Sequence, residues 1–265
     1  MVATEIISIT SGAVAGLVTD SILYPIDTIK TRIQSTRTIL KSNLYKNLFS
    51  GIPTVIAASA PNAAVFFLSY EFIKKLNNQS TCPVITSLAA TGGEISACLI
   101  RCPFEVIKQR SQDQPKLKLY QVTMNTISEN GILRGLYRGY FTMVFREIPF
   151  SIIQFPIWEH LKKNLKERQN NEPLKSWQSA ICGFFAGGTA AVLTTPLDVA
   201  KTRIMIAEKG SFYYSGSLIK SLGIIFQESG IRGLFFGVGP RFIQISCGGA
   251  IFLGVYDFVR NSIMA

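Results

Sequence analysis

The sequence predicts an all-α membrane protein in which six transmembrane helices form three pseudo-symmetric two-helix repeats around a central cavity. Three observations carry this prediction. Only 16% of the 265 residues are charged, whereas roughly 25% are charged in an average soluble protein. Six long stretches of the chain are almost free of charge, and two short sequence strings each occur three times.

The six apolar stretches are each long enough to cross a bilayer, which takes about 20 helical residues. Residues 51–70, 76–93 and 176–197 contain no charged side chain, and the other stretches are interrupted at only one or two positions. An even number of spans places both termini on one side. The alternative, the buried core of a soluble helical protein, would leave too little polar surface to cover six such segments. The predicted spans are residues 5–33, 53–75, 84–111, 140–165, 177–205 and 238–260.

Each odd-numbered span ends in the string P-x-[DE]-x-x-K, which begins at Pro25, Pro103 and Pro196. A proline inside a helix removes a backbone hydrogen bond and kinks the helix, so three such helices would converge at one end. An acid and a base three residues apart share a helix face. We therefore expect a ring of ion pairs between helices, here called the proline-string ring; the alternative is a weak pair within each helix, worth about 0.3–0.5 kcal/mol. The expected pairs are Asp27 with Lys108, Glu105 with Lys201, and Asp198 with Lys30.

Each even-numbered span ends in a second string, an aromatic residue followed by an acid and, three residues later, a base. These charges would form a second ring, the aromatic-string ring, at the opposite membrane face. Two rings that close in turn would open the cavity alternately to each side, as in transporters built from repeats. The predicted repeats are residues 1–79, 80–170 and 171–265. The aromatic-string ring comprises Glu71, Lys74, Glu159, Lys162, Asp257 and Arg260.

Small residues spaced four apart occur on every odd-numbered span: Gly12 with Gly16, Gly93 with Ala97, and Gly183 with Gly187. Small residues at this spacing let helix backbones approach closely in membranes. One such pair is weak evidence, but three in equivalent places predict close packing of each odd-numbered helix.

Six charged residues lie between the two predicted rings, where a charge costs about 2.5–3.5 kcal/mol to insert and is functional by default. They comprise three acids and three bases, which suits a ligand of mixed charge. Ser59, Arg146 with Glu147, and Gln244 fall at equivalent depths on the even-numbered spans. Arg146 can bind a carboxylate with two hydrogen bonds, and Glu147 can accept hydrogen bonds from an ammonium. The pair therefore indicates a binding site for an amino acid moiety. The alternative is an internal ion pair that only stabilises packing. The six charges are Asp20, Glu94, Arg101, Arg146, Glu147 and Arg241.

Composition argues against several other classes of protein. The net charge of +11 could suggest nucleic acid, but the basic residues lie mainly in connecting segments, which suits anionic lipid headgroups instead. Five cysteines without a CxxC motif and a single histidine predict no metal site. A membrane methyltransferase would need a glycine-rich cofactor loop after a strand, and none is found. A structural or receptor protein would have no reason to hold six interior charges. The first residues show no cleavable presequence, so targeting is expected to be internal.

The repeated strings resemble those of the mitochondrial carrier family over essentially the whole chain. The resemblance implies that the proline-string ring is a matrix gate, that the aromatic-string ring is a cytoplasmic gate, and that short helices lie on the matrix side. It also implies a monomer in the inner mitochondrial membrane, with both termini in the intermembrane space and lipids such as cardiolipin around it. Gln34 and Gln112 match the glutamines that brace the matrix gate in the family, whereas Met205 in the third repeat implies one weakened brace.

Four stretches, residues 59–64, 146–156, 176–179 and 194–204, are similar to those of family members that carry S-adenosylmethionine. This resemblance implies import of S-adenosylmethionine in exchange for S-adenosylhomocysteine, without a cofactor. Arg146 is then expected to bind the substrate carboxylate and Glu147 the ammonium, with Asp20 and Glu94 as candidates for the sulfonium. Asn62, Phe66 and Phe67 could meet the adenine, although an aromatic residue on a span more often packs in the core or against lipid. Carriers of another amino acid, a nucleotide or a coenzyme remain alternatives, but the three interior acids oppose a highly phosphorylated substrate.

Overall fold

The computed structural model describes residues 2–35, 44–76, 83–169 and 176–264. Within these ranges the chain is helical apart from turns and short connections, as predicted. The long helices are α1 (Val2–Gln34), α3 (Ile52–Leu76), α4 (Pro83–Asp113), α7 (Tyr140–Arg168), the pair α8 (Ser176–Leu193) and α9 (Thr195–Ile206), and α11 (Val238–Met264). The short ones are α5 (Leu119–Asn130), α6 (Ile132–Leu136), η1 (Phe212–Ser215) and α10 (Leu218–Leu234). The predicted repeat boundaries, after residues 79 and 170, lie outside the described residues.

The long helices coincide with the predicted spans to within a few residues, except that the fifth span is broken. Pro25 and Pro103 lie inside continuous helices. Pro196, in contrast, is the second residue of α9, because the chain leaves helical geometry at Thr194 and α8 meets α9 at a bend of 62°. The predicted kink in the third repeat is therefore a break between two helices.

Hydropathy alone detects fewer spans than the repeat pattern does. Among the described helices, α3 is long and apolar enough to cross a membrane by itself, and two bent pairs, α8 with α9 and α10 with α11, would raise the count to three. Helices such as α4 and α7 carry interior charges, for example Arg101 and Arg146, that lower their mean hydropathy. A span that lines a polar interior is thus under-counted by composition.

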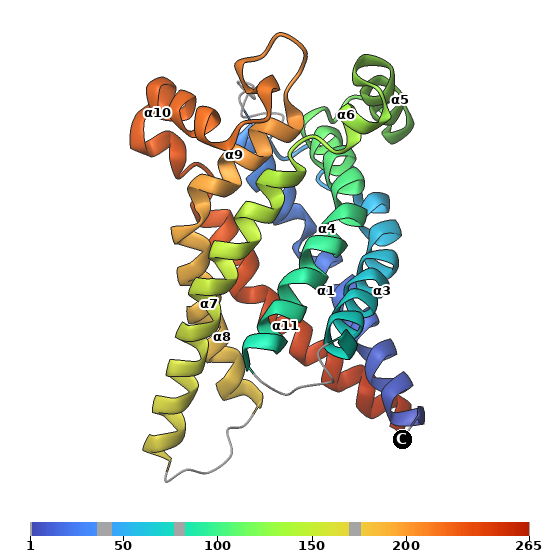
Figure 1. The fold of residues 1–265 in the computed structure, drawn as a ribbon, viewed down its shortest axis with the longest axis vertical. Helices are drawn as coiled ribbons and strands as arrows, with labels where there is room; N and C mark the ends of the chain where they lie inside the picture. The colour runs from blue at the N-terminus through green and yellow to red at the C-terminus, as the bar shows by residue number, and fades with distance from the viewer. Residues whose placement is uncertain (1, 36–43, 77–82, 170–175, 265) are drawn as a thin grey trace.

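The long helices close into a ring. Helix α1 packs on α3, α3 on α4, α4 on α7, α7 on α8, α8 on α11, and α11 returns to α1. The helices that carry the proline strings, α1, α4 and α9, also contact one another, so they converge. Figure 1 shows the short helices α5, α6 and α10 gathered at this end of the molecule, while the beginning of α1 and the end of α11 lie together at the other end.

The small residues predicted to pack closely lie on α1, α4 and α8, and not all of them do so. A methyl group added at Gly93 would lie 3.1 Å from the carbonyl oxygen of Phe66, and one at Gly187 would lie 3.2 Å from the Ile245 side chain. Methyl groups added at Gly12 and Gly16 would meet nothing within 4 Å. The prediction of close packing is therefore wrong for α1, where Gly16 instead lines a cavity.

Candidate functional site

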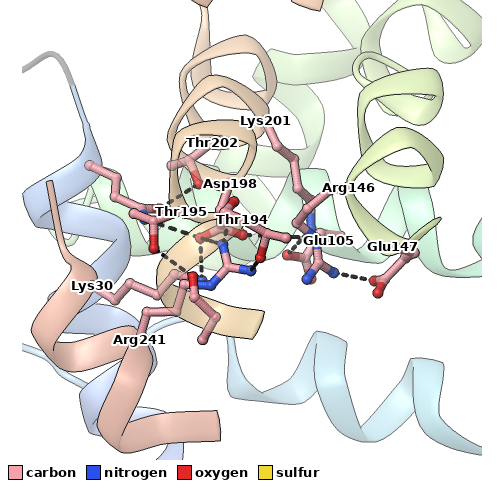
Figure 2. A network of polar contacts seen from close by, with 12 residues as sticks. Lys30, Glu105, Arg146, Glu147, Thr194, Thr195, Asp198, Lys201, Thr202 and Arg241 are labelled. Atoms are coloured by element: carbon pink, nitrogen blue, oxygen red, sulfur yellow. Dashed lines mark hydrogen bonds and ion pairs between the residues drawn. The ribbon is translucent and has the colours of Figure 1, made fainter. Parts of the chain in front are cut away.

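The three converging helices place the proline-string charges at one level, where all three predicted pairs between helices form. Lys30 Nζ lies 2.7 Å from Asp198 Oδ2, Lys108 Nζ 2.7 Å from Asp27 Oδ2, and Lys201 Nζ 3.0 Å from Glu105 Oε1. The alternative contact within one helix is longer, at 3.9 Å between Lys108 and Glu105. The helices are thus joined by reciprocal ion pairs, part of which Figure 2 shows.

Glutamine side chains brace two of the three pairs from the residue four positions after the signature lysine. Gln34 Nε2 donates to Asp198 Oδ2 at 3.0 Å, and Gln112 Nε2 donates to Asp27 Oδ2 at 3.1 Å. In the third repeat the same position is Met205, which is fully buried in an apolar cluster with residues such as Met143. This arrangement agrees with the expected weaker brace at that position.

The third pair has a different brace, which the sequence analysis missed. Gln109 Nε2 donates to Glu105 Oε1 at 2.7 Å, from one helical turn further along α4. Its own Oε1 is buried without a hydrogen-bond partner. Glu105 is therefore held by Lys201 and Gln109, so that a glutamine contacts an acid of every pair in the ring.

Arg241, predicted to bind substrate, is also part of the ring. Its side chain is 0% exposed, with Nη1 3.0 Å from Asp198 Oδ2 and Nη2 donating to Thr194 Oγ1 at 2.7 Å (Figure 2). Gln244, another predicted binding residue, donates to Asp27 Oδ1 at 2.9 Å. Both residues border the cavity at its base, but each uses a side-chain nitrogen to hold a ring carboxylate.

A second ring of contacts lies just beyond the ion pairs and was not predicted. Arg32, Arg110 and Arg203 each donate from Nε to a backbone carbonyl of the next repeat, at 2.8, 3.1 and 3.2 Å. Each arginine stands two residues after a signature lysine, so its repeated position was the signal that could have revealed it. The acceptors are the carbonyls of Gln112, Met205 and Gln34.

In the third repeat this arginine is tied to the short helices. Arg203 Nη1 lies 2.8 Å from Glu228 Oε2, and the Tyr213 hydroxyl donates to the same carboxylate oxygen at 2.6 Å. Burial, together with the hydrogen bond to Glu228, raises the pKa of Tyr213 to about 12. Tyr213 therefore stays a neutral hydrogen-bond donor at physiological pH.

A cavity of about 810 Å³ opens from the proline-string ring. Its volume lies in the range of small-molecule sites. Two predicted binding residues, Glu94 and Glu147, do not line it, and neither does Phe66, which stacks on Tyr70 with ring centroids 6.2 Å apart. The predicted binding residues that do line it are Asp20, Ser59, Asn62, Arg101, Arg146, Arg241 and Gln244.

The two acids absent from the wall are held by arginines. Arg101 Nη2 lies 2.5 Å from Glu94 Oε1 and 3.1 Å from Glu147 Oε1, and Arg146 is hydrogen-bonded to the same oxygen of Glu147 (Figure 2). The Glu147 carboxylate is thus shared by two guanidinium groups. This geometry favours the internal ion pair for Glu147, while it leaves Arg146 on the cavity wall, where a ligand carboxylate could reach it.

Asp20 differs from the other acids of the interior. The ring and the cavity region together hold six acids and six bases, and five of the acids form ion pairs. Asp20 is exposed on the cavity wall and has no ion pair among the described residues. The spare base is Arg241, which is itself fully buried and shares Asp198 with Lys30. The charge that the cavity offers to a ligand without breaking a pair is therefore negative.

The four aromatic-string residues whose side chains the structure describes form no ion pair with one another. Glu71 and Glu159 are exposed. Lys74 lies over the ring of Tyr70 at 5.4 Å and Lys162 over that of Trp158 at 4.0 Å, each on its own helix. The side chains of Asp257 and Arg260 lie outside the described part of the chain. The proline-string ring is therefore closed, while the four described residues of the aromatic-string ring are not paired across helices.

Comparisons with known proteins agree with this architecture. The family model described as mitochondrial carrier protein matches residues 4–44, 79–169 and 172–265. The mitochondrial S-adenosylmethionine carrier protein of Xenopus tropicalis is 51% identical over 257 residues, covering 96% of this chain and 95% of the relative. The protein of the same name from Mus musculus is 49% identical, covering 97% and 94%. The S-adenosylmethionine mitochondrial carrier protein homolog of Drosophila melanogaster is 42% identical, covering 96% and 92%.

Proposed function

Because the chain belongs to the mitochondrial carrier family, we propose that it imports S-adenosylmethionine into the mitochondrial matrix in exchange for S-adenosylhomocysteine. Membership makes the protein a solute carrier of the mitochondrial inner membrane rather than an enzyme. The proposed substrate is that of relatives named as S-adenosylmethionine carriers. These relatives are about 50% identical to this chain and match nearly all of it.

The observation that carries the substrate assignment is the unpaired carboxylate of Asp20 in a cavity that also presents Arg146. S-adenosylmethionine has one carboxylate and two cationic centres, an ammonium and a sulfonium, so it carries one excess positive charge. Arg146 binds the carboxylate, and Asp20 faces the cationic end. Arg101 and Glu147 act as positioning residues that hold the Arg146 guanidinium in place.

Binding at Arg146 also provides a route from the substrate to the gate. Arg146 Nε lies 3.9 Å from Asp198 Oδ1, within the proline-string ring. A substrate carboxylate competes with Glu147 and Asp198 for this guanidinium, so binding removes positive charge from beside Asp198. The contact between Arg146 and Asp198 is thereby weakened when the cavity is occupied, and this couples substrate binding to the gate, as alternating access requires.

The proposal also fixes the orientation of the molecule. The closed proline-string ring is the matrix gate, the aromatic-string ring is the cytoplasmic gate, and both termini face the intermembrane space. The carrier works as a monomer, with its basic connecting segments against anionic lipids such as cardiolipin.

The test is uptake of labelled S-adenosylmethionine into liposomes that contain the purified protein. We expect rapid uptake when the liposomes are preloaded with S-adenosylhomocysteine and little uptake when they are empty. Equal uptake in both cases would contradict exchange, and no uptake in either case would contradict the substrate.

Two variants, each of which removes one negative charge, test the site. Asp20→Asn should lower uptake by at least about tenfold, since it removes the carboxylate that faces the cation. Glu167→Gln, an exposed acid at the end of α7, is the matched control and should leave uptake unchanged. Equal uptake by the Asp20 variant and the wild type would remove Asp20 from the site.

A further inference from the structure

The wall of the cavity extends further along three of the helices than along the other three. Helices α4, α7 and α9 border it only near the proline-string ring, with Arg101 and Arg146 among their residues. Helices α1, α3 and α11 continue the wall away from the ring, as far as Gly16, Asn62 and Phe252. The far part of the cavity is therefore formed by three adjacent helices, because α1 packs on both α3 and α11.

This far part has unusually little side chain in it. Gly16 on α1 and Gly249 on α11 both line the cavity, and a methyl group added at either would meet nothing within 4 Å. Ala63 on α3 is also part of the wall. Open glycines in a cavity wall leave a smooth surface against which a flat ring can lie.

One polar atom in this region lacks a partner. Asn62 Oδ1 is buried and accepts no hydrogen bond. Asn62 follows Gly51 by the same number of residues as Gly248 follows Gly237, so the two lie at matching depths on α3 and α11. Because Asn62 also lines the cavity, a ligand in the cavity could donate to this oxygen.

A carboxamide is well suited to a purine that carries an amino group. Its oxygen accepts from the exocyclic amine of adenine while its nitrogen donates to the adjacent ring nitrogen, a pairing that hypoxanthine cannot satisfy in the same way. Guanine and hypoxanthine present an oxygen where adenine presents the amine. With the carboxamide oriented as it is in this structure, Asn62 Oδ1 meets the amine of adenine but would face the oxygen of guanine or hypoxanthine.

We infer that Asn62, with the open surfaces of Gly16 and Gly249, forms a subsite that selects adenine at the end of the cavity away from the proline-string ring. Asp20 lies one helical turn from Gly16 towards the ring, a rise of about 6 Å. The cationic centre at Asp20 therefore lies between the base at Gly16 and the carboxylate at Arg146. The inference rests on the proposed function and adds the direction in which the substrate lies.

The test compares two substrates in the liposome assay, S-adenosylmethionine and its deaminated analogue, in which hypoxanthine replaces adenine. Wild-type protein should prefer the adenine form by about tenfold. Asn62→Leu, a change of similar size, should abolish this preference. A role for Asn62 in packing alone would lower uptake of both substrates and keep their ratio, which would overturn the subsite.

The glycine surface is tested by filling it. Gly249→Leu should reduce uptake of both substrates by at least tenfold, since the side chain occupies the place of the base. Gly254→Leu is the matched control on the same helix, because a methyl group there also meets nothing within 4 Å but Gly254 does not line the cavity. Equal effects of the two changes would contradict the inference.

A binding measurement separates failure of the subsite from failure of the proposed function. Adenosine should raise the unfolding temperature of the purified wild-type protein more than inosine does, and this difference should vanish in Asn62→Leu. If S-adenosylmethionine is not transported but adenosine is still preferred, the substrate is wrong and the subsite stands. If S-adenosylmethionine is transported without preference over its deaminated analogue, the function stands and the subsite is wrong.

Discussion

The two charged rings are built from the same kinds of residue, yet they are in opposite conditions. In the proline-string ring, every acid meets a base from another helix, and the side chain of Asp198 is only 4% exposed. In the aromatic-string ring, Glu71 and Glu159 are exposed, and Lys74 and Lys162 rest on aromatic residues of their own helices. A buried charge without its partner costs several kcal/mol, whereas an exposed pair contributes little. The comparison teaches that ion pairs between helices stabilise this conformation at the proline-string ring, whereas the described charges of the aromatic-string ring contribute little to it.

The largest effect is expected at Asp198, which contacts Lys30, Arg241 and Gln34. Asp198→Asn leaves the buried Arg241 and the partly buried Lys30 without a counter-charge, at a cost of about 3–5 kcal/mol. Thermal unfolding of the purified protein should show a large decrease in stability, and uptake should be lost. Glu159→Gln, the same type of change in the open ring, serves as the control for stability. Similar unfolding temperatures for the two variants would remove the distinction between the rings.

A second prediction tests that the closed ring is made between helices. Glu105→Lys and Lys201→Glu should each reduce uptake by at least about tenfold, because each change places two like charges at a 3.0 Å contact. The double variant restores opposite charges and should recover part of the uptake. No recovery would indicate that each residue acts through its own helix, and the double-mutant cycle measures the coupling directly.

Removal of the Gln109 hydrogen bond at the third pair should have a smaller effect on stability. Gln109→Ala removes one hydrogen bond to a carboxylate and should lower the free energy of unfolding by about 1.5–3 kcal/mol. Gln227→Ala, an exposed glutamine on α10, is the control and should change stability by less than about 0.5 kcal/mol. Thermal unfolding distinguishes the two; an unchanged stability in Gln109→Ala would show that the third pair needs no brace.

The smallest change in stability is expected in the open ring. Lys162→Gln removes a cation that lies over Trp158 and should lower the unfolding temperature by about 1–3 °C, the equivalent of about 0.5–1 kcal/mol. Uptake should nevertheless fall several-fold, because Lys162 is needed when this ring closes. Lys163→Gln, at the adjacent exposed position, should change neither quantity. Wild-type uptake by the Lys162→Gln variant would exclude Lys162 from the proposed cytoplasmic gate.

The repeated strings were sufficient to predict the pairing of the closed ring, because threefold pseudosymmetry determines which helix follows which. Single positions were harder to predict. Arg241 lies at the depth of a substrate-binding residue, yet its guanidinium reaches Thr194, at the break between α8 and α9. Glu147 was expected to be available to an ammonium, but Arg101 reaches it from α4. Side-chain direction decides both outcomes, and sequence spacing does not specify it.

The substitute brace illustrates a different limit. Met205 is a departure from the family pattern, but nothing in the sequence assigns its role to Gln109, because only the structure shows that this side chain turns back to Glu105. The arginines of the second ring could have been found, since Arg32, Arg110 and Arg203 follow the signature lysines at a constant distance.

The contacts of these arginines have a consequence for how the chain can change. Their acceptors are main-chain carbonyls at residues 112, 205 and 34. A substitution at any of the three positions alters a side chain but keeps the carbonyl, so this layer of the closure is insensitive to mutation there. The replacement of a glutamine by Met205 is an example that the chain already contains. An engineer who wishes to loosen the gate in graded steps can therefore vary these positions while the arginine layer keeps the repeats in register.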